Sequence, residues 1–246
     1  MNIRLSVTII TLNEEEKLAK CLESVKFAEE IVVVDCGSTD KTIEISKRYG
    51  AKIYHREFDN FANQKNYAAS KASGNWIFSI DADEEVTVDL VNEIKLALNS
   101  AEYVGYLIPR KNFILGGEIK YTRWSPDTHI WLWQKDKGRW VREVHEEVEI
   151  KGLVGRLKNA KLHYQDKTVA EFIKTNNKYS ELEAEKLIKT SIRFSYLSMF
   201  WEPIYEFVLR YIYKRGFLDG WRGFVLSYLM AIYKLTVWVK IWERKK

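Results

Sequence analysis

The sequence of 246 residues contains only two cysteines, Cys21 and Cys36, and they do not form a CxxC pair. Two cysteines cannot build a disulfide framework, so we expect a reducing compartment. The first residues also lack the basic, apolar and cleavage regions of a secretory leader, because the chain enters a strand-like run at Leu5. We therefore expect a protein that is not secreted.

Acidic residues are scarce near the C-terminus. Residues 207–246 hold nine Lys/Arg against two Asp/Glu, whereas residues 1–206 hold 30 against 32. The body of the chain is near neutral and the tail is basic, which suggests an anionic partner, either a membrane surface or a nucleic acid. With 46% hydrophobic and 30% charged residues, the composition is typical of a globular chain and excludes a disordered one.

Short apolar runs alternate with helical patterns through the first hundred residues. The run at 5–10 is typical of a buried parallel strand. A second strand is expected at 31–34, a weak third at 52–54 and a fourth at 76–80. The order β-α-β-α-β-α-β predicts a parallel sheet with helices on both faces. Ligands of such sheets gather at the carboxyl ends of the strands, so the residues that follow each run are candidate ligand contacts.

Asp81-Ala82-Asp83 is the most specific of these strand-end signals. Two carboxylates separated by one residue, directly after a buried strand, form a rigid acidic corner. Mg²⁺ and Mn²⁺ prefer one or two carboxylates together with phosphate oxygens. The tripeptide is common on solvated surfaces, but its place after the fourth strand favours a metal site that neutralises a diphosphate leaving group.

Other strand ends carry weaker signals. Asp35 could accept hydrogen bonds from a ribose or a base, and Ser38 and Asp40 are nearby to cap the following helix, so Asp35 itself looks spare. Thr11, Asn13 and Glu14 follow the first strand, where Asn13 is equally well explained as a helix cap with Glu16 completing a capping box. Lys65 could contact phosphate or be an ordinary helix-surface lysine.

His145-Glu146 offers a candidate catalytic base. A sugar hydroxyl loses a proton as it attacks, and a carboxylate within hydrogen-bond reach can take that proton. Spacing does not single out Glu146 among Glu143, Glu147 and Glu149, which together also fit a charged strand edge. His145 could bind a metal or be a satisfied structural histidine. The remaining histidines show no ligand spacing and receive no role: His55, His129 and His163.

The C-terminal segment changes character. Residues 194–242 hold 15 of the 34 aromatic residues, set among basic ones. The run 223–242 is long enough to span a bilayer, but Lys234 and Lys240 interrupt it, and a lysine inside a membrane is costly. At 100° per residue Arg222, Lys240 and Arg244 share one narrow sector, which predicts an interfacial helix. The alternative is a core-packing helix with a solvated basic edge.

Six segments together resemble the inverting glycosyltransferases of family 2, which have a GT-A fold. The superfamily motifs are SVTIITLNEEEKLAKCLESV, EIVVVDCGSTDKT and QKNYAASKASGNWIFSIDADE. WSPD, VHEEV and GFLDGWRGF resemble the bacterial subgroup that contains lipopolysaccharide-core β-1,4-glucosyltransferases. The resemblance implies a Rossmann-like nucleotide-binding domain with a mixed sheet over residues 1–169. It is followed by a helical, membrane-associating extension over residues 170–246.

The resemblance also implies roles for particular residues. It places Asp81 against the ribose, Ala82 in the donor site and Asp83 on the metal, and it raises Glu146 above its neighbours as the base. It further implies nucleoside or nucleotide contacts for Thr11, Asn13, Glu14, Asp35 and Lys65. One departure stands out, because Trp131 occupies a position where the subgroup usually has arginine. The acceptor of this chain therefore stays open.

The leading hypothesis is a metal-dependent hexosyltransferase on the cytoplasmic face of the cell membrane. It would use Mg²⁺ or Mn²⁺ to move a sugar, with UDP-glucose as one candidate donor, onto a lipopolysaccharide-core or lipid-linked saccharide. The basic aromatic tail would hold it on anionic lipid. The alternatives are a polyprenyl-phosphate sugar synthase, a catalytically silent scaffold, and a single-stranded nucleic-acid binder that uses the tail. Because the last leaves Asp81 and Asp83 unexplained, we expect no nucleic-acid partner.

Overall fold

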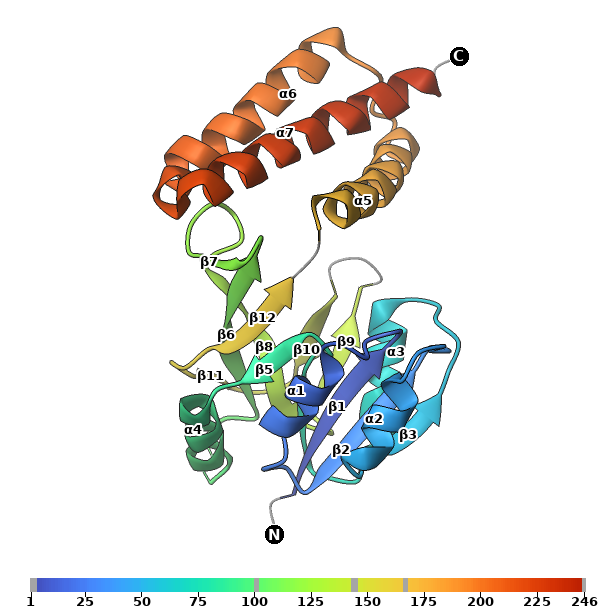
Figure 1. Ribbon diagram of the computed structural model, residues 1–246, viewed down its shortest axis with the longest axis vertical. Coiled ribbons are helices and arrows are strands. Elements are labelled where there is room, and N and C mark those ends of the chain that lie inside the picture. The colour runs from blue at the N-terminus through green and yellow to red at the C-terminus, as the bar shows by residue number, and fades with distance from the viewer. Residues whose placement is uncertain (1–3, 100–101, 143–145, 166–167, 245–246) are drawn as a thin grey trace. The chain divides into compact units, whose positions relative to one another are not determined.

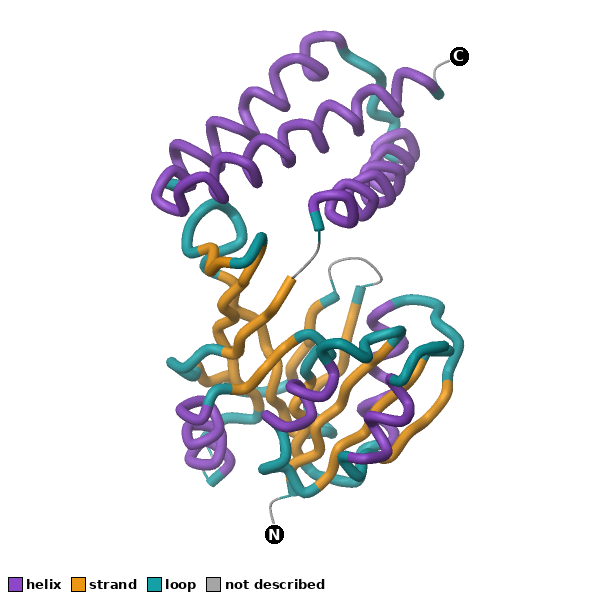
Figure 2. Tube along the Cα trace, viewed as in Figure 1, coloured by secondary structure: helices purple, strands orange, loops and turns teal. Residues whose placement is uncertain are grey.

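The computed structural model describes residues 4–99, 102–142, 146–165 and 168–244. The chain divides into two compact units. The first comprises Met1–Arg110 and Asp127–His163, and the second comprises Lys111–Pro126 and Tyr164–Lys246. Figure 2 shows that strands and helices mix in the first unit and that helices dominate the second. The expected domain boundary between residues 169 and 170 stays a prediction.

The first unit begins with the expected alternation of strands and helices. β1 (Leu5–Thr11) pairs in parallel with β2 (Glu30–Asp35) on one side and with β4 (Trp76–Ser79) on the other, and β2 pairs in parallel with β3 (Lys52–His55). The helices between them are α1 (Leu18–Ser24), α2 (Thr42–Arg48) and α3 (Phe61–Lys71) (Figure 1). In register, Thr11 lies opposite Asp35, so the ends of β1 and β2 meet at one edge of the sheet.

Antiparallel strands extend this parallel core into the mixed sheet that the resemblance implies. β8 (Asp127–Gln134) pairs with β4 and with β6 (Gly105–Ile114), and the sheet order is β3-β2-β1-β4-β8-β6-β12-β5. This part also holds a helix and several short strands: β5 (Glu84–Val86), α4 (Val88–Leu98), β11 (Val154–Arg156) and β12 (Lys161–Gln165). β9 (Gly138–Val141) and β10 (Glu147–Ile150) form a separate antiparallel pair.

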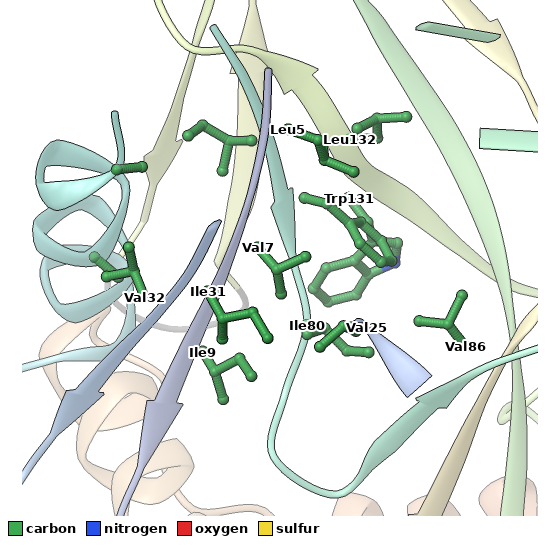
Figure 3. Packing of buried hydrophobic residues seen from close by; sticks show 14 of the residues in the cluster. Leu5, Val7, Ile9, Val25, Ile31, Val32, Ile80, Val86, Trp131 and Leu132 are labelled. Carbon is green, nitrogen blue, oxygen red and sulfur yellow. The ribbon is translucent and has the colours of Figure 1, made fainter. Parts of the chain in front are cut away.

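The core of the first unit lies along β1, β2, β4 and β8. Figure 3 shows Val7 of β1 beside Trp131 of β8, and Ile9 and Leu132 belong to the same buried cluster. Burying one such aliphatic side chain contributes roughly 1.5–3 kcal/mol, and the near-continuous apolar strands therefore supply much of the stability. This burial fixes the strand ends, and with them the residues that follow.

The second unit is a helical extension joined to a short strand. It contains β7 (Gly117–Ile119), α5 (Val169–Lys189), α6 (Tyr196–Val208), a π-helical turn (Leu209–Tyr213), a 3-10 turn (Gly216–Asp219) and α7 (Gly220–Glu243). Thr168 and Glu171 form a capping box at the start of α5. α7 packs against both α5 and α6. A Cβ at Gly223 would lie only 1.8 Å from the carbonyl oxygen of Gly216, so this close turn requires glycine.

The prediction that Asn13 caps the first helix is wrong. Asn13 has a φ of 55°, and α1 begins only at Leu18, after Lys17, which makes no side-chain cap. The Asn13 carboxamide oxygen instead accepts a hydrogen bond from the N–H of Thr39, 2.8 Å away. Asparagine tolerates the left-handed conformation, so the loop between β1 and α1 uses it for a long-range contact.

Candidate active site

The ends of β1 and β2 are tied together by side chains of the two following loops. The backbone N–H of Asn13 donates to the Ser38 hydroxyl at 2.9 Å, and the N–H of Glu14 donates to the Thr42 hydroxyl at 2.8 Å. Together with the contact from Thr39 to Asn13, these bonds join the two loops. The result is a preformed polar rim beside the parallel strands, where nucleotides bind in such folds.

Asp35 is less available than the sequence suggests. One carboxylate oxygen accepts from the hydroxyls of Thr11 at 3.1 Å and Ser38 at 2.5 Å, and the other accepts from the N–H groups of Gly37 at 2.8 Å and Ser38 at 2.9 Å. A carboxylate has about four acceptor positions, and here all are used. The interpretation of Asp35 as a spare carboxylate is therefore wrong, because this side chain shapes its own loop.

Three predicted residues from distant segments meet at Lys65. This lysine lies on α3 and is 3% exposed, and its Nζ is 3.1 Å from Asp81 Oδ1 and 3.0 Å from Glu146 Oε1. The same Nζ lies 4.6 Å from the centre of the Trp140 ring. The alternative that Lys65 is an ordinary surface lysine is thus wrong. Its ammonium joins the first carboxylate of the Asp81-Ala82-Asp83 motif to the candidate base.

The charges around Lys65 and Asp81 stabilise one another. Burial alone lowers the pKa of Lys65, but Asp81 and Glu146 outweigh it, so the pKa lies above its usual value. Burial alone raises the pKa of Asp81, but Lys65, Lys161 and Arg110 hold it below its usual range. Both groups are therefore charged at neutral pH, as opposite charges at short distance require.

A buried network below the motif fixes its turn. The N–H of Glu84 donates to the carbonyl oxygen of Asp81 at 3.1 Å, and the Glu84 carboxylate accepts from the N–H of Asp81 at 2.9 Å. The fully buried Glu84 also pairs with Lys161 at 2.5 Å and with Arg110 at 3.3 Å. Ala82 is buried within this turn. Burial lowers the pKa of Lys161 to about 8, although Glu84 and Asp81 act to raise it.

Asp83 is paired with a histidine to which the sequence assigned no role. Nε2 of His163, on β12, lies 3.4 Å from Asp83 Oδ2. His145, the predicted histidine ligand, lies outside the described residues. Within the described ranges no three His, Cys, Asp or Glu residues converge as a complete metal cage. A carboxylate and an imidazole nevertheless fit Mn²⁺ or Mg²⁺ when phosphate oxygens and water supply the remaining ligands.

Trp131 lies among cations at the centre of this region. It is buried on β8, with Lys161 Nζ 3.1 Å from its ring centre, and Lys65 and Arg110 lie within 5.6 Å of it. Asp127, a second carboxylate near the site, accepts from Arg110 at 2.7 Å and contacts His129 at 2.9 Å. An arginine at position 131 would add a fourth positive charge here, whereas tryptophan offers its π face to those already present.

Comparison with known proteins identifies the family. The family model "Glycosyl transferase family 2" matches residues 6–144, which is more than half of the chain. The chain belongs to glycosyltransferase family 2. Lipopolysaccharide core biosynthesis glycosyltransferase LpsC of Rhizobium meliloti is 30% identical over 98% of this chain and 92% of its own length. An uncharacterised glycosyltransferase of Rickettsia typhi is 29% identical over 98% of this chain and 87% of its own length.

Solved structures support the fold of this family 2 member. TarS 1-349 of S. aureus in complex with UDP-GlcNAc aligns with a TM-score of 0.53 and 16% identity, covering 95% of this chain and 82% of that one. Glucosyl-3-phosphoglycerate synthase from Mycobacterium tuberculosis, in complex with Mn²⁺, UDP and phosphoglyceric acid, aligns with a TM-score of 0.50 and 14% identity. That alignment covers 79% of this chain and 81% of the synthase. At such identities the likeness establishes the GT-A type of fold alone.

Within this family 2 domain, sequence reasoning missed three residues that surround the acidic motif. Glu84 could have been noticed, because it directly follows Asp83 and repeats the acidic character of the strand end. Lys161 and His163 carry no local signal, because they belong to the strand β12, far along the chain. Their proximity to Glu84 and Asp83 follows from the antiparallel pairing of β12 with β5, which aligns His163 with Glu84.

Proposed function

We propose that this family 2 glycosyltransferase transfers a hexose from a nucleoside diphosphate sugar, with UDP-glucose as one candidate donor, to a lipopolysaccharide-core or lipid-linked saccharide. The observation that carries the proposal is the convergence of Asp81, Lys65 and Glu146. The Lys65 ammonium contacts both the donor-side carboxylate of Asp81 and the candidate base Glu146. The name of the LpsC relative supports the acceptor class. Complexes of the structural neighbours with UDP-GlcNAc and UDP support a uridine nucleotide.

The donor end is assigned to the strand ends of the parallel sheet. Thr11, Asn13 and Glu14 line the rim for the nucleoside, and Asp35 holds the loop at 36–38 in shape for it. Asp81 and the buried Ala82 form the turn against which the ribose rests. Asp83 and His163 would hold Mg²⁺ or Mn²⁺, and His145 remains a further proposed ligand. When bound, the metal ion stabilises the negative charge that develops on the departing diphosphate.

Glu146 is assigned as the base that takes the proton from the acceptor hydroxyl. As the acceptor oxygen attacks the anomeric carbon, its proton passes to the Glu146 carboxylate, a new glycosidic C–O bond forms, and the bond from the anomeric carbon to the diphosphate oxygen breaks. Attack from the side opposite the leaving group inverts the anomeric configuration. Lys65 holds the carboxylate of Glu146 in place through their 3.0 Å contact.

The enzyme is proposed to act at the inner face of the cell membrane, where a lipid-linked acceptor would be available. The nucleic-acid alternative is less favoured by the contacts of the tail. Arg222 donates to backbone carbonyls at 115 and 116, and Lys240 and Arg244 contact Glu181 of α5. These cations are therefore already committed inside the second unit and do not form a free stripe for phosphates.

The test is a panel of nucleotide sugars with and without Mn²⁺. A ligand present at 100 times its Kd stabilises the native state by about 2.7 kcal/mol, which a melting experiment detects readily. We expect a UDP-sugar with Mn²⁺ to raise the Tm and to release UDP when a truncated lipopolysaccharide acceptor is added. If UDP is released only with a polyprenyl phosphate, the acceptor assignment is wrong. If no nucleotide sugar raises the Tm, the enzyme assignment itself is contradicted.

A further inference from the structure

The exposed surface of the α6–α7 hairpin is unusual for a water-soluble domain. From residue 196 to 235, a stretch that the structure describes completely, every exposed residue is a large apolar or aromatic one except Lys214, Arg215 and Gly220. We call these exposed residues the hairpin face; Phe200, Trp201 and Tyr213 are examples. Soluble monomers rarely expose so large a contiguous apolar patch without a partner for it.

The hairpin face is continuous between its helices. Phe224 of α7 lies 5.8 Å from Phe207 of α6 and 5.6 Å from Tyr211 of the π-helical turn, measured between ring centres. It also stacks on Tyr228 of α7 at 6.3 Å. α6 and α7 run side by side in Figure 1, and these rings connect their exposed sides. These four rings thus link α6, the π-helical turn and α7.

The opposite side of α7 faces a charged helix. Lys234 pairs with Glu183 at 2.6 Å, and Lys240 pairs with Glu181 at 3.1 Å, both on α5. α5 exposes many charged residues to solvent, among them Lys178 and Glu185. By length and composition alone, the helical stretch Gly216–Glu243 could cross a membrane, with a mean hydropathy of 1.5. Spanning would carry α5 and these ion pairs into the hydrocarbon layer at a high energetic cost.

We propose that the hairpin face binds the surface of an anionic lipid bilayer, with α6 and α7 lying in the interface and α5 remaining in water. Trp and Tyr are the residues that favour the headgroup level, and Lys214 and Arg215 at the turn between the helices supply the attraction to anionic lipid. This inference deepens the membrane location proposed above. It does not depend on sugar transfer, because vesicle binding is measured without any nucleotide.

Charge distinguishes a lipid surface from a second copy of the chain. A symmetric dimer through the hairpin face would bring the same patch of each copy together. Lys214 and Arg215 would then meet a surface that has no exposed acidic residue between positions 196 and 235. An anionic bilayer provides the missing negative charge, so the lipid surface is the better occupant.

The first experiment is flotation of the full chain with vesicles of phosphatidylglycerol and phosphatidylcholine. Trp201 and Trp221 are each 58% exposed, so Trp201→Glu with Trp221→Glu should leave the packing intact. We expect this double variant to lose at least about 100-fold in partitioning. The matched control is Leu182→Glu on α5, an apolar residue that is 44% exposed, which should bind as the wild type does. Equal flotation of the double variant and the wild type overturns the proposal.

A second pair of variants tests the charge. Lys214→Gln with Arg215→Asn removes two positive charges, and asparagine tolerates the left-handed conformation of residue 215, whose φ is 56°. At about fivefold per basic residue, binding to anionic vesicles should fall roughly 30-fold, while binding to pure phosphatidylcholine should hardly change. Equal losses on both vesicle types contradict the electrostatic part. The lipid partner is contradicted if the wild type does not bind vesicles and instead forms a dimer that these variants or the tryptophan variants disperse.

Spin labels keep the proposal testable should the tryptophan variants fail to fold. A nitroxide on Phe217→Cys, on the hairpin face, should become shielded from an aqueous nickel reagent when phosphatidylglycerol vesicles are added. The same label on Leu182→Cys should stay accessible. Equal accessibility of both labels with vesicles present overturns the proposal. Each variant should keep the rise in Tm that a UDP-sugar produces in the wild type. A loss of vesicle binding with that rise retained concerns this inference alone, and leaves the enzyme assignment intact.

Discussion

Replacing Lys65 with methionine removes the cation that joins Asp81 to Glu146. Methionine keeps an unbranched apolar stem but leaves two carboxylates facing each other without a charge between them. Breaking a fully buried ion pair costs about 3–5 kcal/mol. The side chains of Asp81 and Glu146 are 28% and 21% exposed, so water offsets part of that loss. We expect a stability loss of about 2–3 kcal/mol, which lowers the Tm by roughly 5–10 °C.

The pH dependence gives this prediction a sign. The pKa of Asp81 is raised by burial and lowered more strongly by Lys65, Lys161 and Arg110, so it lies below its unfolded value. A depressed carboxyl pKa contributes stability that is present above the unfolded pKa of about 4 and is lost as the pH falls through the folded pKa. The difference in Tm between wild type and Lys65→Met should therefore be complete at pH 7 and shrink below about pH 4.

Lys71→Met is the matched control for this experiment. Lys71 ends the same helix, α3, and its Nζ lies over the rings of Tyr54 and Tyr67 at 5.3 and 4.8 Å. Losing these contacts should cost less than about 1 kcal/mol. Thermal melts of the three proteins between pH 3 and pH 7 measure the effect. A Lys65→Met protein as stable as wild type at pH 7, or a difference that does not change with pH, would refute the reasoning.

The other predictions concern the candidate base, the candidate metal ligands and the buried Glu84. Glu146→Gln should lower turnover by about 10²–10⁴-fold and leave donor affinity nearly unchanged. Glu147→Gln and Glu149→Gln on β10 should lower turnover only slightly. If one of these two variants loses turnover instead, that residue is the base. Asp83→Ala and His163→Ala should each abolish or strongly reduce the rise in Tm that Mn²⁺ with UDP produces, while the protein stays folded. Unchanged turnover of these variants at saturating Mn²⁺ contradicts the metal assignment. Glu84→Gln should cost about 3 kcal/mol of stability because it removes the anionic partner of the buried Lys161, and Glu85→Gln, on the other side of β5, should be near neutral in the same denaturant titration.

The parts of the fold that local pattern controls were predictable from the sequence. Three of the four parallel strands, β1, β2 and β4, are short apolar runs whose burial needs no distant information, and the strand order follows from the alternation with helices. The acidic motif was recognised because it directly follows such a run. The fold and family that the resemblance implied are confirmed. The catalytic and binding roles of Glu146, Asp83 and the nucleotide-site residues stay predictions.

The contacts that organise the candidate site were not predictable, because they join residues far apart in the chain. His163 reaches Asp83 only through the pairing of β12 with β5. Asn13 looked like a helix cap because its local pattern fits one, and its long-range bond to Thr39 prevailed. Asp35 looked spare because Ser38 was assigned to cap the helix, whereas the Ser38 hydroxyl donates to Asp35 itself. Each error came from assigning a polar side chain to its nearest neighbour in sequence.

The C-terminal helix shows why a helical projection alone could not decide between a membrane helix and a core helix. The sector of Arg222, Lys240 and Arg244 looked like the polar face of an interfacial helix, yet these cations bind α5 and the loop at 115–116. One side of α7 therefore packs, with Val237 and Trp238 buried, while Trp221, Phe224 and Tyr228 on the other side are exposed. The core-packing alternative describes the buried face of α7, and the membrane proposal concerns only its exposed face. Deleting α7 would remove both at once, so only substitutions confined to the exposed side can separate membrane binding from folding.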